Sequence, residues 1–359
     1  MKNTILYFLL SITLISCSAK QELLVKHSNP LVTYEGRIRQ NEATGTELFW
    51  PGTAVNINFE GTEIHAVIQD EKGENYYNVI VDNQVVKVLQ PTTKKEKYTL
   101  ASGLSPGKHS LQLYRKTEFT SGKTTFFNFV INHNAKLLPA EPKKRKIEFY
   151  GNSISAGHGL DDLEGKDRGD AAFYNNYLAY SALTARHFDA EYNCICKGGI
   201  GLMISWFPYT MPDIYDKINP LDKISVWNFS NYTPDIVVVN LFQNDSWLVK
   251  KPNSERFKAV FQDIEPTKED IITAYKTFIS SIRTHYPNAD IICALGNMDS
   301  TKEGSPWPNY IKEATNQLHD SKIHTLIFPF KNTPGHPNRV EHENMSELLI
   351  KYIDEHIKW

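Results

Sequence analysis

The hydrophobic and polar positions of the chain follow two different rhythms, which change near residue 140. From about residue 31 to residue 138, apolar and polar side chains alternate in short segments, as in Ala-Val-Asn-Ile-Asn-Phe at 54–59. Successive side chains of a strand point to opposite faces, so this alternation predicts strands with one buried face. The predicted strands are 54–59, 77–81, 85–89, 97–100, 109–115 and 124–132. Turns separate them and no helical period interrupts them, which indicates an all-β sandwich.

The second half of the chain alternates strands with helices. Residues 139–146 are rich in proline and charge, which is typical of a solvated connector between two domains. Beyond them, uninterrupted apolar runs such as 236–239 predict a parallel sheet that is covered on both faces. The predicted strands are 146–151, 191–196, 235–241, 290–295 and 324–330, and the predicted helices are 171–188, 267–286, 309–318 and 339–356. This order predicts a three-layer α/β domain.

The first 17 residues predict an export signal. Lys2 is followed by an apolar run that is too short to span a bilayer, as in the core of a signal peptide. The ending Leu-Ile-Ser-Cys resembles a bacterial lipobox, which implies that Cys17 is diacylated; an ordinary cleaved signal peptide is the alternative. We therefore expect an exported lipoprotein, tethered in the periplasm or at the cell surface. The expected parts are a signal peptide at 1–17, a β-sandwich at 25–140 and an α/β domain at 141–359.

Charge and cysteine content exclude several classes of protein. The chain has 39 basic and 41 acidic side chains, so it lacks the basic excess that nucleic-acid binding requires. Its 4 cysteines are too few for a disulfide-stapled miniprotein. Cys194 and Cys196 lie on the same face of a predicted strand, without the paired spacing of a metal site. We expect these two and Cys293 to be buried and reduced.

Candidate chemistry lies where the predicted parallel strands end, which is the edge of an open sheet that binds ligands. Ser153 follows the first strand, the glycine-rich run 197–201 the second, Asn244 the third and His336 the last. A hydroxyl, a flexible loop, an amide and an imidazole on one edge suit acyl transfer. Each also has a plainer interpretation, because serine caps helices, glycine and asparagine form turns, and histidine is common in surface loops.

The order of these residues resembles the SGNH (GDSL-like) hydrolases. Residues 147–155, Ile-Glu-Phe-Tyr-Gly-Asn-Ser-Ile-Ser, match the first block of that superfamily, and Gly199, Asn244 and His336 match the later blocks. The closer resemblance is to carbohydrate esterase family 2, whose members join a jelly-roll domain to an SGNH domain with a flavodoxin-like sheet. Further matching segments lie at 34–37, 50–55, 228–230, 234–240 and 282–287.

The resemblance implies an esterase that removes acetyl groups from sugars. Ser153 would attack the acetyl carbonyl after His336 removes its proton. The backbone N–H groups of Ser153 and Gly199 and the side-chain amide of Asn244 would form the oxyanion hole. Donors of this kind are each worth about 2.7–4 kcal/mol of the barrier.

Three residues depart from the superfamily pattern. Asn152 replaces an Asp, Phe242 stands in the third block where Gly is usual and is expected to narrow the acyl pocket, and Thr333 stands where many members place an Asp three residues before the catalytic histidine. The resemblance to family 2 implies a Ser–His dyad in which a backbone carbonyl orients the histidine. Asp245 and Asp299 are the candidate substitutes for the missing acid.

The expected substrate-binding residues are Trp247, Phe242, Asp245 and Trp307. Trp206 is a weaker candidate, and core packing is the plainer interpretation for any tryptophan. The sequence contains no HExxH, no paired CxxC, no EF-hand loop and no nucleotide-binding glycine loop after the first strand. We therefore expect chemistry without a cofactor or a metal.

The interpretation that these observations favour is a carbohydrate O-acetylesterase acting on acetylated plant or algal polysaccharides or oligosaccharides of the acetylxylan or acetylmannan type. The alternative is a carbohydrate-binding lipoprotein with an inactive or weakly active esterase domain, motivated by Asn152, Phe242 and Thr333. Retention of the complete set of catalytic matches favours the enzyme. A lipase acting on long acyl chains is a third alternative, which Phe242 disfavours.

Overall fold

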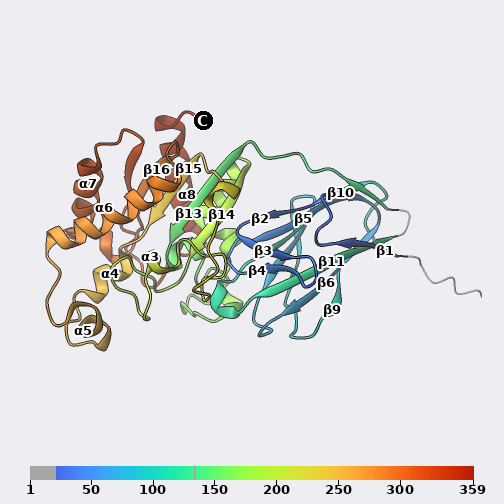
Figure 1. Cartoon of the computed structure of the whole chain (residues 1–359), viewed down its shortest axis with the longest axis horizontal. Coiled ribbons are helices and arrows are strands. Elements are labelled where there is room, and N and C mark those ends of the chain that lie inside the picture. Colours follow the sequence, from blue (N-terminus) through green and yellow to red (C-terminus); the bar gives the residue numbers. More distant parts are fainter. Residues whose placement is uncertain (1–21, 133–134) are drawn as a thin grey trace, which may run out of the picture.

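The computed structural model describes residues 22–132 and 135–359. The lipobox and Cys17 lie outside the described residues. Two antiparallel sheets come first along the chain and a parallel sheet with helices follows, and the two parts lie end to end in Figure 1. This confirms the predicted fold class, a β-sandwich followed by a three-layer α/β unit.

The β-sandwich consists of two six-stranded antiparallel sheets. The strands of one sheet are β1 (Glu22–Lys26), β3 (Ile38–Asn41), β4 (Gly45–Leu48), β6 (Glu63–Asp70), β9 (Glu96–Ser102) and β11 (Thr124–Asn132). Those of the other are β2 (Val32–Glu35), β5 (Ala54–Glu60), β7 (Tyr77–Val81), β8 (Gln84–Leu89), β10 (Lys108–Arg115) and β12 (Lys136–Leu138). Alternate residues of β5 and β6, such as Ile57 and Ile68, meet Phe126 in the core between the sheets. Apolar residues therefore alternate along these strands because every second side chain is buried between the two sheets, as inferred from the sequence.

Six strands of the sandwich lie at the predicted places, and six were not predicted. Strands β2, β3 and β4 have four residues each and little alternation, so their sequences carry a weak signal. Strand β6 does alternate, with Ile64, Ala66 and Ile68 buried, and could have been found.

The second part contains a five-stranded parallel sheet in the order β14-β13-β15-β16-β17. Its strands are β13 (Arg145–Gly151), β14 (Ala190–Cys196), β15 (Ile236–Asn240), β16 (Asp290–Leu295) and β17 (Ile323–Ile327). This is the flavodoxin-like order 2-1-3-4-5. In the register, Gly151 at the end of β13 lies opposite Cys196 of β14 and Asn240 of β15. The segments that follow these three strands therefore start side by side.

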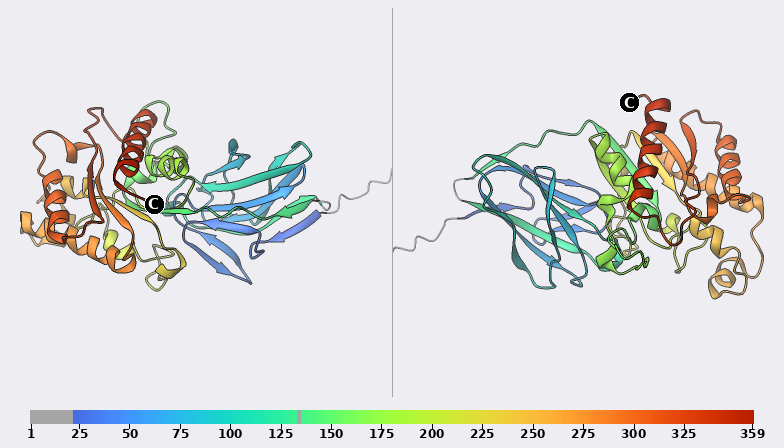
Figure 2. Two further views of the ribbon diagram at one scale, coloured as in Figure 1. Left: turned by 90° about the horizontal axis from the view of Figure 1, so that it is seen from above. Right: turned by 180° about the vertical axis from the view of Figure 1, so that it is seen from behind.

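Helices cover both faces of this sheet. Side chains of one face, such as Val238, pack with α2 (Tyr180–His187) and α8 (Arg339–His356). Side chains of the other face, such as Val237 and Val239, pack with α6 (Lys268–His285) and α7 (Trp307–Leu318). In Figure 2 the red α8 and the light-green α2 lie together on one side of the sheet and the orange helices on the other. Alternate apolar residues of the strands thus build two cores.

The helix predicted at 171–188 is wrong in its first half. Residues 171–178 form two 3-10 turns, η2 (Ala171–Phe173) and η3 (Asn176–Leu178), and the helix begins at Tyr180. Asn175 and Asn176 use their side chains to bind Asp161 and the Ser155 carbonyl, which competes with helical hydrogen bonding. The short helices α1 (Ser153–Ala156), α3 (Met211–Ile214), α4 (Gln243–Leu248) and α5 (Glu255–Phe261) were not predicted.

Buried polar contacts join the two parts of the molecule. Arg37 from the sandwich is fully buried with Glu148 of β13, at 3.3 Å, and Trp50 donates its indole N–H to the Ile218 carbonyl at 2.9 Å. Cys194, Cys196 and Cys293 are free and buried, as predicted. None of the described helices is long and apolar enough to cross a membrane.

Candidate active site

Ser153 stands on a sharp turn between a strand and a helix. Strand β13 ends at Gly151, where a Cβ atom would lie 2.2 Å from the Ser155 hydroxyl, so only glycine fits. Asn152 caps α1, and its Oδ1 accepts the Ile154 N–H at 3.0 Å. Asn152 is one of the three residues that depart from the superfamily pattern, and its side-chain amide oxygen serves here as the helix cap. The side chain of Ser153 lies at the first position of this helix.

His336 lies beside Ser153, although 183 residues separate them in the chain. It is in the loop between β17 and α8, just before Asn338, which caps α8. The distance from His336 Nε2 to Ser153 Oγ is 2.8 Å. At this distance, the imidazole nitrogen can accept the hydroxyl proton as the oxygen attacks.

A carboxylate orients the other side of the imidazole. His336 Nδ1 lies 2.8 Å from Oδ1 and 3.1 Å from Oδ2 of Asp167, in the loop after α1. At Gly335 a Cβ atom would lie 2.9 Å from Asp167 Oδ2, so glycine there permits the approach. The geometry is a Ser–His–Asp triad and corrects the expected dyad with a backbone carbonyl. Asp167 was missed in the sequence.

Asp299 and Asp245, the residues considered above for the acid that would orient the catalytic histidine, have other partners, and so does Thr333. Asp299 accepts the indole N–H of Trp247 at 3.0 Å, and Asp245 binds backbone N–H groups of residues 202–204. Thr333 donates its hydroxyl to Glu341 of α8. None of the three contributes to the orientation of His336.

A second histidine lies against the triad. The ring of His158 packs at a tilt of 31° against that of His336, with centroids 3.9 Å apart, and His158 Nε2 is 3.5 Å from Asp167 Oδ1. Its Nδ1 is 3.0 Å from the Tyr174 hydroxyl. Burial and the charge of protonated His336 lower the pKa of His158 to about 4. We assign a neutral His158 with its proton on Nε2, because this tautomer faces the carboxylate with a donor.

Asp167 is ionised in this arrangement. Burial opposes its ionisation, but hydrogen bonds and charge from His336 outweigh burial and lower the pKa of Asp167 below its usual value. Ligand atoms of His158, Asp167 and His336 all lie within 4.8 Å of one another, so these residues could hold a metal ion. A metal there would compete with the Asp167–His336 hydrogen bond, on which the triad depends.

The loop after β14, residues 197–204, carries Gly199, the expected oxyanion donor, and is called the oxyanion loop below. Gly199 has φ +79°, a left-handed conformation, and a Cβ there would crowd Phe207 and Trp206 at 3.2–3.3 Å. Asp245 of α4 accepts the N–H groups of Leu202, Met203 and Ile204, at 2.7–3.1 Å. Burial raises the pKa of Asp245 to about 6, although these bonds favour the charged form. Asp245 has no exposed surface, so it shapes the loop and the expectation of substrate contact is corrected.

The three expected donors to the oxyanion follow adjacent strands: Ser153 comes after β13, Gly199 after β14 and Asn244 after β15. Asn244 donates one Nδ2 hydrogen to the Ile200 carbonyl at 2.8 Å, and its Oδ1 accepts the Trp206 indole N–H at 3.0 Å. The second Nδ2 hydrogen of Asn244 remains for a ligand. In the described parts of the chain, the backbone N–H groups of Ser153 and Gly199 donate to no backbone acceptor.

The structure corrects two of the aromatic candidates. Phe242 and Trp307 are buried, and their rings pack against each other with centroids 5.0 Å apart. They belong to the core and cannot contact a substrate in this structure. Trp247 is half-buried, and Trp206 is 47% exposed beside Asn244, which makes Trp206 the stronger candidate for sugar contact.

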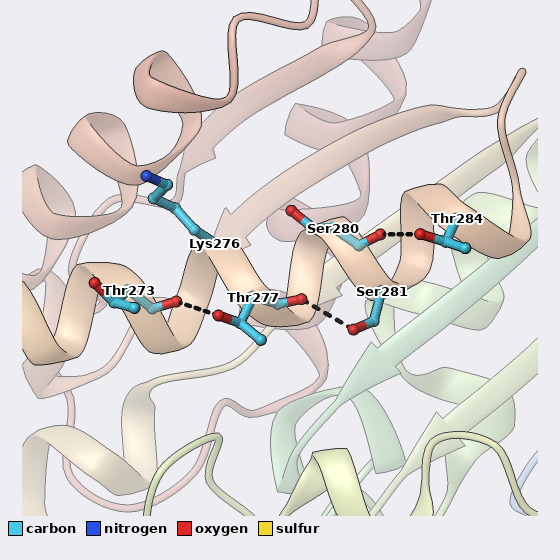
Figure 3. A pocket seen from close by; sticks show the side chains of 6 residues that line it. All are labelled: Thr273, Lys276, Thr277, Ser280, Ser281 and Thr284. Atoms are coloured by element: carbon cyan, nitrogen blue, oxygen red, sulfur yellow. Dashed lines mark hydrogen bonds between the residues drawn. The ribbon is translucent and has the colours of Figure 1, made fainter.

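A surface depression on α6 carries no comparable chemistry. Its lining consists of side chains of one helix: Thr273, Lys276, Thr277, Ser280, Ser281 and Thr284. Figure 3 shows that hydroxyls here bind the helix's own carbonyls, as from Thr277 to Thr273 at 2.9 Å. The hydroxyls of Thr277, Ser281 and Thr284 are engaged in this way, and the lining contains no pair like Ser153 and His336.

Comparison with known proteins found similar sequences. Residues 34–141 match the family model described as Carbohydrate esterase 2 N-terminal. The chain is 31% identical over 351 residues to the cellulase/esterase CelE of Acetivibrio thermocellus, covering 92% of this chain and 40% of that protein. It thus spans less than half the length of CelE. It is 24% identical to an acetylxylan esterase/glucomannan deacetylase of Cellvibrio japonicus, covering 96% and 95% of the two chains.

A solved structure is similar over both parts of the molecule. A family two carbohydrate esterase from Clostridium thermocellum, solved in complex with cellohexaose, superposes with a TM-score of 0.81 at 31% identity. The match covers 90% of this chain and 98% of that one. The sandwich and the parallel sheet are therefore shared as a unit.

Proposed function

The chain belongs to carbohydrate esterase family 2, a family of serine ester hydrolases of the SGNH type, and we propose that it removes acetyl groups from the hydroxyls of plant or algal polysaccharides and oligosaccharides. The observation that carries this proposal is the 2.8 Å contact between Ser153 Oγ and His336 Nε2, next to the loop of Gly199. It supports an active enzyme over the alternative of a decayed site.

In the first half of the reaction, Ser153 Oγ attacks the acetyl carbonyl carbon and its proton passes to His336 Nε2. Asp167 stabilises the imidazolium that results. The negative charge on the carbonyl oxygen is stabilised by the N–H groups of Ser153 and Gly199 and by Asn244. When this intermediate collapses, the bond to the sugar oxygen breaks and that oxygen takes the proton from His336.

In the second half, water replaces the sugar. His336 removes a proton from the water while the water oxygen attacks the carbonyl carbon of acetyl-Ser153, and the same donors stabilise the oxyanion. Collapse returns the proton to Ser153 Oγ and releases acetate.

The proposed substrate class is supported by the names of two relatives and by the charge of the chain. Two Cellvibrio japonicus relatives are named acetylxylan esterase/glucomannan deacetylase. A net charge of −2 suits an uncharged glycan. We propose that Trp206 and Trp247 contact the sugar, because exposed indole faces pack on the apolar faces of pyranose rings.

The test is acetate release from acetylxylan, acetylated glucomannan and p-nitrophenyl acetate by the purified protein, with the deacetylated position identified by NMR. We expect release from all three, and at least about a 10³-fold loss of kcat in Ser153→Ala and His336→Ala. Wild-type turnover in Ser153→Ala would refute the assignment of the nucleophile.

A second candidate function is glycan binding at the same site. The structure of the Clostridium thermocellum esterase was determined with cellohexaose. We propose that this chain also binds cello-oligosaccharides, and calorimetric titration with cellohexaose tests it. Binding by Ser153→Ala, which leaves the competitor acetylated, is the expected result, and acetylated xylo-oligosaccharide is expected to abolish it. Absence of heat at millimolar ligand would exclude it.

We also propose that the protein is exported and anchored by lipid through Cys17. The support is the lipobox-like sequence alone. Expressed with its full N-terminus, the wild type is expected in the membrane fraction and Cys17→Ala in the aqueous fraction. Mass spectrometry of the N-terminal peptide would show a diacylglycerol group on Cys17, and an unmodified cleaved peptide would contradict the proposal.

A further inference from the structure

A carboxylate of the β-sandwich lies against the oxyanion loop of the other part of the molecule. Glu118 follows β10 and precedes the 3-10 turn η1 (Phe119–Ser121). Its Oε2 accepts the backbone N–H of Gly198 at 2.7 Å, and its Oε1 lies 3.0 Å from Lys197 Nζ. Both Glu118 and Lys197 are buried. We propose that Glu118, acting with Lys197, is a positioning residue that fixes the oxyanion donor of Gly199.

The argument depends on one peptide plane. Lys197 Nζ also donates to the carbonyl oxygen of Gly198 at 2.7 Å. That carbonyl belongs to the same planar peptide unit as the N–H of Gly199, and the two point in opposite directions in a trans peptide. An ammonium group that holds the carbonyl on one side therefore determines where the Gly199 N–H points on the other. Its positive charge also polarises the peptide and strengthens that N–H as a donor.

Glu118 holds this arrangement at two points. Its carboxylate places Lys197 Nζ, and it also holds the N–H of Gly198, so both sides of Gly198 are fixed. A Cβ at Gly198 would lie 3.6 Å from both carboxylate oxygens and 2.9 Å from the Tyr174 hydroxyl. Glycine at this position therefore leaves the space in which Glu118 and Tyr174 approach the loop.

The sandwich holds Glu118 rigidly. Arg115, which is fully buried, donates to the Glu118 carbonyl at 3.1 Å, and Thr120 donates its hydroxyl to Oε1 at 3.2 Å. Phe119 packs against Trp50 with ring centroids 5.3 Å apart. A carboxylate on such a support loses little conformational entropy when it binds the loop. The sandwich would thus complete the active site.

The Glu118–Lys197 pair could instead serve only to hold the two parts of the molecule together. A pair with that role alone affects stability and leaves the chemical step unchanged once the protein is folded. A positioning role lowers kcat at nearly constant KM, because the Gly199 N–H matters most when the oxyanion forms. This inference rests on the proposed esterase function.

The experiment measures kcat and KM for p-nitrophenyl acetate, together with melting temperature, in Glu118→Ala, Glu118→Gln and the double variant Glu118→Ala/Lys197→Met. Glu35→Gln is the matched control, because Glu35 forms the equivalent ion pair at the junction with Lys143, also at 3.0 Å. Ser153→Ala is included to test the proposed function itself.

We expect Glu118→Ala to lower kcat about 10- to 100-fold with KM within about threefold of wild type. Glu118→Gln retains an oxygen acceptor for the Gly198 N–H and is expected to lose about 3- to 10-fold. In the double variant the unpaired buried ammonium is gone, so the melting temperature recovers while kcat stays low. Glu35→Gln is expected to keep the wild-type kcat.

Two results would overturn the inference. One is a wild-type kcat in Glu118→Ala while Ser153→Ala is inactive, which would leave the proposed function intact. The other is recovery of kcat together with the melting temperature in the double variant, which would show that the pair is only a clamp. Wild-type activity in Ser153→Ala would instead refute the proposed function, and the inference with it.

Discussion

Replacing Asp167 by Asn removes the charge that faces His336 Nδ1 and keeps the size of the side chain. The carboxylate accepts the Nδ1–H at 2.8 Å and stabilises the imidazolium that forms when Ser153 loses its proton. A hydrogen bond to a charged group contributes a net value of about 1.5–3 kcal/mol. Since about 1.36 kcal/mol corresponds to a factor of ten, kcat/KM is expected to fall about 10- to 150-fold.

The exposure of Asp167 limits the size of this effect. Its side chain is 35% exposed, so solvent screens the charge more than in a buried triad, where the same change costs about 10⁴-fold. The assay is hydrolysis of p-nitrophenyl acetate at neutral pH, where Asp167 is ionised. Asp170→Asn is the matched control, an exposed carboxylate of the same loop. A loss of less than twofold in Asp167→Asn would refute the triad and restore the dyad.

Three further predictions concern the site and its support. Asp245→Asn replaces the carboxylate that accepts the N–H groups of residues 202–204 with a neutral amide. Urea unfolding should show a loss of about 1–3 kcal/mol in the free energy of unfolding, and an unchanged urea midpoint would contradict this. Trp206→Phe removes the hydrogen bond to Asn244 and should lower kcat for p-nitrophenyl acetate, which carries no sugar, about 2- to 10-fold. An unchanged kcat for this substrate would contradict a role for the hydrogen bond in positioning Asn244. Burial lowers the pKa of His342 to about 3, so between pH 6.5 and about 4 only the unfolded chain protonates it. The free energy of unfolding of the wild type then falls on acidification by up to about 1.4 kcal/mol per pH unit. In His342→Asn, Oδ1 replaces the acceptor of the Tyr180 N–H, and urea titrations across this range should show a smaller loss of unfolding free energy per pH unit. An equal loss in the variant would contradict the assignment.

The parallel sheet and two members of the triad could be predicted from the sequence. Uninterrupted apolar strands identified the sheet, and Ser153 and His336 follow its first and last strands. The carboxyl ends of parallel strands form one edge, so position in the chain was enough to bring these residues toward the same site. Their mutual distance was not predictable, because the loop that carries His336 crosses from β17 to β13.

Asp167 was not predictable in the same way. It lies in a polar loop with several other acidic residues, and only the tertiary approach permitted by Gly335 selects it. Phe242 misled the interpretation for a different reason. It holds a left-handed backbone with φ +77°, where the superfamily pattern has Gly, and its ring is retained in the core by Tyr275 and Trp307. Sequence spacing placed it near the site but did not indicate which way its side chain points.

The role of Glu118 also depends on tertiary contacts. It lies 35 residues before Ser153 in the chain, in the other part of the molecule, and no local pattern distinguishes it from other acidic residues near strand ends. Its burial beside Gly198 and Lys197 appears only when the sandwich meets the oxyanion loop.

The central claim is that Ser153 carries the acetyl group between the two halves of the reaction. The most direct measurement is peptide mass spectrometry of enzyme quenched with acid during turnover of p-nitrophenyl acetate. The account predicts one acetyl group on the peptide that contains Ser153 in the wild type, and none on that peptide in Ser153→Ala, together with loss of acetate release. Acetylation of a different residue during turnover, or undiminished acetate release by Ser153→Ala, would contradict it.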